Sequence, residues 1–172
     1  MVKSTPSVIN YIRGLEHSAD LDRSHLETAA AWAKKRRVYI HHTFEECAAK
    51  KYFGVFDDFS LLSVISIEVT GEGEYLFHVT SAPKSDLELI ANAVYQIGWS
   101  LFDRLKAEII YTHRPAINGH EHRGSTAMCE MTGLHPYGLP EEEEINGVRY
   151  EWQVYQMTRF DWLIDHQKRE AA

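Results

Sequence analysis

The stretch EYLFHVTSAPKSDLELIANAVYQIGWSLFDRLKAEIIYTH, residues 74–113, decides the fold of this chain. Residues 75–80 are rich in aromatic and β-branched side chains and predict a strand, which Pro83 ends because proline has no amide to donate. Apolar residues then recur at spacings of three and four and predict one face of a helix: Leu87, Ile90, Ala91, Val94, Ile97, Leu101 and Leu105. Residues 108–113 predict a second strand, so the stretch reads as a βαβ unit with adjacent parallel strands.

The residues before this unit predict helices followed by an antiparallel meander. A first helix is expected after Thr5-Pro6, with Ile12 on its apolar side. Strands are expected at 52–56 and 61–69, and polar turns connect them to each other and to the strand at residue 75.

The residues after the unit predict a loop, a short helix and two strands. Residues 114–123 are polar and are expected to form a loop, and Gly133 is expected to close a helix at 125–131. Asn146-Gly147 predicts a turn that leads into a long strand at 148–157.

Helix starts are marked by a Ser or Thr that stands three residues before an acidic residue. In such a capping box the hydroxyl accepts a hydrogen bond from a first-turn amide, and the acidic side chain reaches back to the cap. The pairs are Ser24 with Glu27, Thr43 with Glu46, Ser85 with Glu88, and Thr158 with Asp161. The last pair predicts a terminal helix through about Lys168.

Composition indicates one folded domain and disfavours some classes of partner. The chain has 172 residues, of which 44% are hydrophobic, and a net charge of -7. We expect a single domain with N-terminal helices at 1–50, a core at 52–162 and a C-terminal helix at 159–172. The acidic balance disfavours a nucleic-acid or membrane partner. Cys47 and Cys129 suggest no disulfide framework, and no signal peptide or spanning run is evident, so a cytoplasmic location is expected.

The order of these elements resembles the GNAT acyltransferase fold over residues 52–162. The most specific part is Ser125-x-x-x-Cys129-x-x-x-Gly133-Leu134, which is followed by Gly138 and by a strand that closes on Met157-Thr158-Arg159-x-Asp161-Trp162. The resemblance implies an α+β or α/β fold with a GNAT-like mixed sheet. Its antiparallel meander is followed by a central βαβ unit, with helices on both faces of the sheet.

The phosphate-binding loop departs from the family's pattern. That pattern, Gln/Arg-x-x-Gly-x-Gly/Ala, lets backbone amides approach the pyrophosphate of acyl-CoA. Residues 80–86 stand at this place and read TSAPKSD, which contains no glycine and includes Pro83. If the chain binds acetyl-CoA, the resemblance implies the following cofactor-binding residues: Val79, Ser81, Lys84 and Ser85. We expect the binding to be weak or absent.

The catalytic positions depart as well. If the chain is an enzyme, the resemblance implies Glu68 as the base that activates the amine through water. Cys129 stands where the family often has the Tyr that protonates the leaving thiolate, so Cys129 or nearby Tyr137 would be the acid. A cysteine on an apolar helix face is more often inert packing, and we expect Cys129 to be structural, with a raised pKa. His122 stands in place of the usual Asn, and Leu134 in place of Phe.

Two other kinds of site have weaker support in the sequence. His113, His120 and His122 lie around Glu121 and include a His-x-His pair, but the spacing fixes no third ligand, so we expect no metal site. A Ser-His-Asp hydrolase is also disfavoured, because the sequence contains no Gly-x-Ser-x-Gly elbow.

Because several site features depart together, the sequence favours a GNAT-fold protein with a degenerate acyl-CoA signature. Our first interpretation is a non-catalytic virion or head assembly factor of phage or prophage type, which acts by contact with a phage or host protein in the host cytoplasm. Its candidate contacts are Trp32, the basic residues 34–37 and the acidic loop 141–144. The alternative is an acyl-CoA-dependent N-acyltransferase that transfers acetyl to an amine of a protein or small molecule.

Overall fold

The strands form one mixed sheet. The computed structural model describes residues 12–13, 23–36, 50–57, 60–121 and 123–172. The sheet order is β1-β2-β3-β4-β5-β8-β7, with β6 paired to β5. The strands are β1 (Ile12–Arg13), β2 (Lys50–Asp57), β3 (Ser60–Gly71), β4 (Glu74–Ser81), β5 (Ile109–Ile117), β6 (His120–Glu121), β7 (His135–Ile145) and β8 (Val148–Thr158). The helices are α2 (Arg23–Arg36), α3 (Leu87–Asp103), α4 (Arg123–Thr132) and α5 (Arg159–Ala171).

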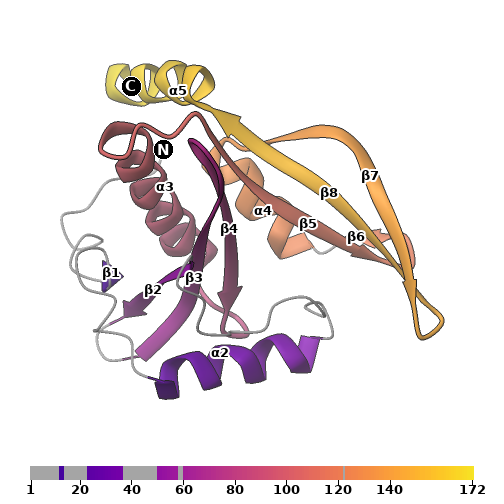
Figure 1. The fold of residues 1–172 in the computed structure, drawn as a ribbon. Coiled ribbons are helices and arrows are strands. Elements are labelled where there is room, and N and C mark those ends of the chain that lie inside the picture. Colours follow the sequence, from indigo (N-terminus) through magenta and orange to yellow (C-terminus); the bar gives the residue numbers. More distant parts are fainter. Residues whose placement is uncertain (1–11, 14–22, 37–49, 58–59, 122) are drawn as a thin grey trace.

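The predicted βαβ unit is confirmed. β4 and β5 pair in parallel, from Glu74 opposite Ile109 to Leu76 opposite Tyr111, and α3 connects them. The predicted meander β2-β3-β4 is antiparallel, as are the other described strand pairs. Figure 1 shows β4 and β5 adjacent at one end and diverging toward the other.

The hydrophobic core lies between the sheet and the helices α3 and α4. Its members from the sheet include Phe53, Val55, Ile65, Ile67, Phe77 and Ile110, and those from α3 include Ile90, Val94, Ile97 and Leu101. A Cβ atom at Gly98 would lie 3.3 Å from Ile110 Cδ1, so this glycine lets α3 approach β5 closely. The apolar spacing of three and four therefore did identify the buried face of α3.

The helix α2 covers the other face of the sheet. It packs against β3 and β4, where Val64 is buried. Val64 points away from α3 because successive side chains of a strand alternate between faces, and its neighbour Ile65 belongs to the α3 core. The ring of His25 meets the edge of Phe56 with centroids 5.4 Å apart. Helices on both faces agree with the fold class that the sequence predicts.

Gly133 ends α4, as predicted. Its φ of +80° lies in the left-handed region, which favours glycine, and a Cβ atom there would come within 2.9 Å of Met157 Cε. The amide of Leu134 donates to the Cys129 carbonyl at 2.9 Å and closes the helix. The chain can then turn directly into β7.

The predicted cap of the terminal helix α5 is also confirmed. Thr158 Oγ1 accepts from the Asp161 amide at 3.2 Å, and Asp161 Oδ2 accepts from the Thr158 amide at 3.1 Å. This cap fixes the direction in which the chain leaves β8. One turn into α5, Trp162 stacks on Phe102 of α3 with ring centroids 5.3 Å apart.

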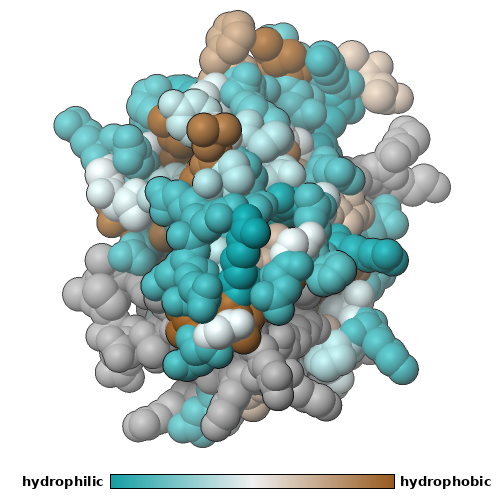
Figure 2. Space-filling view, turned by 90° about the vertical axis from the view of Figure 1, so that its right-hand side faces the viewer, coloured by the Kyte–Doolittle hydropathy of each residue, from teal (hydrophilic) through white to brown (hydrophobic). Residues whose placement is uncertain are grey.

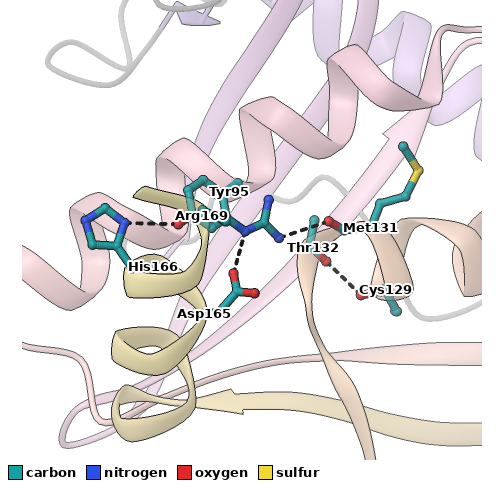
Figure 3. A network of polar contacts seen from close by, with 7 residues as sticks. All are labelled: Tyr95, Cys129, Met131, Thr132, Asp165, His166 and Arg169. Carbon is teal, nitrogen blue, oxygen red and sulfur yellow. Dashed lines mark hydrogen bonds and ion pairs between the residues drawn. The ribbon is translucent and has the colours of Figure 1, made fainter. Parts of the chain in front are cut away.

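A polar network around Arg169 holds the rest of α5 (Figure 3). The guanidinium lies over the Tyr95 ring of α3, 4.3 Å from its centroid, and donates to Asp165 at 2.5 Å. It also donates to the Met131 carbonyl of α4 at 3.3 Å, while the Tyr95 hydroxyl lies 3.2 Å from His166 Nδ1. One side chain thus connects the three helices α3, α4 and α5.

The predicted cap of α3 is wrong. Asp86, not Ser85, is the N-cap residue: its Oδ1 accepts from the amides of Glu88 at 2.9 Å and Leu89 at 3.2 Å. Both residue types are good caps, and a carboxylate also interacts favourably with the positive end of the helix. The Ser85 hydroxyl is directed back to the loop, where it donates to the Ala82 carbonyl at 2.8 Å.

Three other segments differ from the prediction because they are strands. Ile12–Arg13 forms β1 on β2 instead of part of a helix. The expected loop 114–123 is the end of β5 followed by a turn and β6. The expected acidic loop lies within β7, where residues 141–144 pair with β8. These residues are all exposed, so the strand has no alternation of apolar and polar residues by which the sequence could predict it.

Smaller differences concern helix boundaries. The helix α2 begins at Arg23, so Ser24 lies within it and is not its cap. Leu105 lies beyond the end of α3 and is 56% exposed, so it is not part of the buried face. The expected caps at Thr5 and Thr43 lie outside the described residues.

The surface on the side of the β7–β8 hairpin is mainly hydrophilic. Figure 2 shows this face with only small hydrophobic patches, one of them at the height of α5. Exposed apolar side chains of α5 are Phe160, Leu163 and Ile164. In the described part of the chain, no helix is long and apolar enough to cross a bilayer.

The packing of α3 on the sheet makes a first prediction. Val94→Asp places an unpaired carboxylate at a position that is 5% exposed, beside Ile110. We expect urea denaturation to show a loss of several kcal/mol in the free energy of unfolding. Gln96→Glu is the control, since it adds the same charge at a half-buried polar position of the same helix. Equal stabilities for the two variants would contradict this packing.

Candidate active site

The strands β4 and β5 separate beyond Leu76 and Tyr111 and open a cleft. Each strand continues to pair with its antiparallel partner: β4 stays paired with β3 as far as Ser81, and β5 stays paired with β8 as far as Ile117. The cleft has a volume of about 440 Å³. Its walls come from β4, the loop before α3, β5 and the first turns of α4. This size lies within the range of small-molecule binding sites in proteins.

The outer end of the cleft is formed by the loop between β4 and α3. This loop is tied to β3, because the Ala82 amide and the Ser85 hydroxyl both donate to the Leu62 carbonyl, at 2.8 and 3.2 Å. Lys84 follows with a left-handed φ of +62°, and its exposed side chain lines the cleft. Among the described lining residues, Lys84 is the sole lysine or arginine.

The inner end of the cleft carries two histidines on facing strands. His78 of β4 and His113 of β5 have ring centroids 6.4 Å apart, and Tyr111 meets His113 edge-on at 5.9 Å. Burial lowers the pKa of His113 below its usual value of 6.5, and the Glu141 carboxylate opposes part of this shift. His113 is therefore neutral at physiological pH and has a ring nitrogen that can accept a proton.

The wall opposite β4 is the apolar side of α4. Cys129 is 2% exposed, and Met128 and Leu134 line the cleft beside it. Burial raises the pKa of Cys129 to about 12, although the nearby Arg114 guanidinium acts in the opposite direction. The thiol stays protonated at neutral pH, which agrees with the expectation of a structural cysteine with a raised pKa.

Arg114 is a buried cation beneath the start of α4. Its side chain is 7% exposed, and Nη1 lies 2.5 Å from Glu121 Oε1 and 3.4 Å from Thr126 Oγ1. The guanidinium also lies over the Tyr155 ring, 5.4 Å from the centroid. These contacts hold the N-terminal turn of α4 against β5, and that turn contributes Ser125 to the cleft.

The structure brings together some of the predicted site residues and separates others. Five of them line the cleft: Val79, Ser81, Lys84, Ser85 and Cys129. Glu68 and Tyr137 are not among its lining residues. Glu68 is on β3 and pairs with Leu76 of β4, and Tyr137 is on β7 and pairs with Val154 of β8. Each of the two strands is therefore two places away from β5 in the sheet, on opposite sides of it.

The sequence analysis did not identify the two residues of the cleft that are best suited to acid–base chemistry. His78 lies in a strand with no motif around it, and His113 entered only as a possible metal ligand. Pairing of the two strands brings their rings together, and one sequence alone does not show this. Within the described ranges, no group of three His, Cys, Asp or Glu side chains is arranged to hold a metal ion.

Comparisons with known proteins identify the fold. No model of a known protein family matches the sequence, and no curated protein does. Spermidine N-acetyltransferase from Vibrio cholerae in complex with CoA and spermine matches with a TM-score of 0.66 and 17% identity, over 88% of this chain and 96% of that one. A dodecameric structure of that enzyme in an intermediate state matches with a TM-score of 0.63 and 18% identity, over 83% of this chain and 93% of that one. A chimera of that enzyme with hSSAT matches with a TM-score of 0.68 and 18% identity, over 88% of this chain and 96% of that one.

The likeness confirms the GNAT-like fold, and the cleft occupies the opening between its parallel strands. It also corrects the first functional interpretation, a non-catalytic assembly factor of phage or prophage type. That interpretation is wrong, because the three solved structures named above share the fold and are spermidine N-acetyltransferases, one of them in complex with CoA. The altered motifs at the phosphate loop and at the catalytic positions had led to that interpretation.

The burial of Cys129 makes a second prediction. Because its pKa is about 12, little thiolate exists at neutral pH, and we expect iodoacetamide to label the native protein slowly and the unfolded protein rapidly. Cys129→Ala should cost about 1 kcal/mol of stability for the small volume lost. Mass spectrometry of the alkylated protein checks the labelling. Rapid native labelling would show that the thiol is accessible and ionised.

Proposed function

We propose that the chain is an N-acyltransferase that takes an acyl thioester such as acetyl-CoA as donor and an amine as acceptor. The observation that carries this proposal is the cleft between the diverging parallel strands, with the neutral His113 at its inner end. The solved structures of the same fold support it, since one is an N-acetyltransferase in complex with CoA. The acceptor is an amine of a small molecule or a protein.

The cleft fits an extended pantetheine arm. The ladder between β4 and β5 ends at Leu76 and Tyr111, so beyond this point the edges of both strands face the cleft. Strand edges present amides and carbonyls that bind an extended amide-containing chain. Phe77, Leu87 and Met128 supply apolar contacts along the walls. The arm would place its thioester near His113 and its phosphate end near Lys84.

His113 would act as the base of the transfer. As the amine nitrogen forms a bond to the acyl carbon, a ring nitrogen of His113 accepts the proton that the amine loses. The carbon–sulfur bond breaks, and the same histidine returns the proton to the departing sulfur. Cys129 is a poor proton donor for this step, because its pKa of about 12 exceeds that of an ordinary thiol. The net charge of -7 favours the approach of a cationic amine, which loses one proton to solvent before its neutral form attacks.

The role of His113 makes a third prediction, tested by acetyl transfer from acetyl-CoA to spermidine and other amines. In the wild-type protein kcat should fall as pH drops through a pKa below 6.5, because the protonated ring cannot accept a proton. His113→Gln should lower kcat about 100-fold and remove this acidic limb. His120→Gln is the control, since His120 is exposed on β6.

Two results would contradict the proposal at different levels. Transfer that proceeds at the wild-type rate and with the wild-type pH profile in His113→Gln would remove His113 as the base. Absence of transfer to every amine, together with no change in thermal stability on addition of acetyl-CoA, would remove the acyltransferase itself, because a ligand of the native state must stabilise it.

A further inference from the structure

We infer that Asp86 occupies the place at the start of α3 where a donor's diphosphate would otherwise bind, so that the cleft selects its donor by the phosphopantetheine arm and not by the nucleotide. The inference deepens the proposed function and rests on it. It names the donor class as phosphopantetheine thioesters. Acyl-CoA is a member of this class whose nucleotide half adds little affinity.

Two first-turn amides of α3, those of Glu88 and Leu89, are already engaged by the Asp86 carboxylate. The start of a helix leaves amides without partners inside the helix, and these ordinarily attract anions. Here Asp86 Oδ1 accepts from the amides of Glu88 and Leu89, at 2.9 and 3.2 Å, and the Asp86 carbonyl accepts from Ile90 at 3.2 Å. A phosphate at this position would have to displace a carboxylate that has the same sign of charge.

The loop before α3 offers few other hydrogen-bond donors that could bind a phosphate in place of the first-turn amides. Pro83 has no amide hydrogen, and the Ser85 amide donates to the Ala82 carbonyl at 3.3 Å. The Ser85 hydroxyl donates to the carbonyls of Ala82 and Leu62, at 2.8 and 3.2 Å. The Ser85 amide and hydroxyl are thus directed to carbonyls of the loop and of β3 and away from a bound phosphate.

Lys84 is the one lysine or arginine among the described residues that line the cleft, and it is the cation that a phosphate would meet there. It is exposed, lines the cleft and is held at a positive φ by the turn around it. Its single positive charge suits a phosphate monoester at the end of the pantetheine arm. A diphosphate with a further ribose phosphate brings more negative charge than Lys84 offsets, and it brings that charge next to the Asp86 carboxylate.

Calorimetric titrations with pantetheine, phosphopantetheine and CoA test this inference on the full chain. In the wild-type protein, CoA should bind no more than about threefold tighter than phosphopantetheine. Asp86→Ser keeps a good helix cap but removes the charge, so CoA should bind about tenfold tighter to this variant. Pantetheine should bind equally to both proteins, because it carries no phosphate.

Matched variants separate the effect of the capping carboxylate on CoA affinity from the effect of removing any negative charge near the start of α3. Glu88→Gln removes a charge from the same turn, but the Glu88 side chain is exposed and has no bond to the first-turn amides, so CoA affinity should change less than about twofold. Lys84→Gln should weaken phosphopantetheine and CoA but leave pantetheine unchanged. Thermal unfolding of each variant establishes that it is folded.

The outcomes distinguish this inference from the proposed function. If CoA binds much more tightly than phosphopantetheine to the wild-type protein, and Asp86→Ser does not change this, the inference is overturned while the acyltransferase proposal stands. If none of the three ligands binds any variant, both are overturned. An equal gain in CoA affinity in Asp86→Ser and Glu88→Gln would also overturn the role of the cap.

Discussion

The short parallel pairing between β4 and β5 is the constraint on which the rest of the structure depends. The two strands share a ladder only from Glu74 opposite Ile109 to Leu76 opposite Tyr111. Beyond this point each strand is held by its own antiparallel neighbour, β4 by β3 and β5 by β8. The strands can therefore separate without losing the ladders that hold each half of the sheet, and the gap between them becomes a cleft.

The helices turn this gap into a chemically defined site. α3 packs on the meander side and follows the loop with Lys84 and Ser85, which lines the outer end of the cleft, while α4 covers the opposite wall with Cys129. The inner end carries His78 and His113, whose rings face each other across the strands. Apolar walls, one cation at the mouth and a neutral base at the inner end are the features on which the proposed acyl transfer rests.

Periodicity in the sequence was enough to predict most of the framework. The spacing of Ile90, Val94 and Ile97 marked the buried side of α3, and the strands of the meander were evident from their β-branched residues. Local pattern failed in two places. It could not decide between Ser85 and Asp86 as the cap of α3, because both neighbouring residue types are good caps. It also did not reveal that the acidic residues 141–144 form a strand on the edge of the sheet, because that strand depends on pairing with β8.

The site was only partly predictable for the same reason. Val79, Ser81, Lys84, Ser85 and Cys129 follow from their positions in a resemblance, and all line the cleft. The proximity of His78 to His113 arises from strand pairing, which a single sequence does not display. The missing glycines and Pro83 were taken as evidence against an enzyme. The structure shows instead that the cleft persists and that its outer end is differently built.

Hydrogen–deuterium exchange with and without acetyl-CoA tests the central claim most directly, because it reports where on the chain the ligand binds. We expect acetyl-CoA to slow exchange in the segments that line the cleft: residues 77–87 of β4 and the following loop, 112–113 of β5, and 124–129 of α4. Exchange in β7 should be unchanged. Absence of any slowing in these segments at saturating acetyl-CoA, or slowing confined to another part of the chain, would contradict the account.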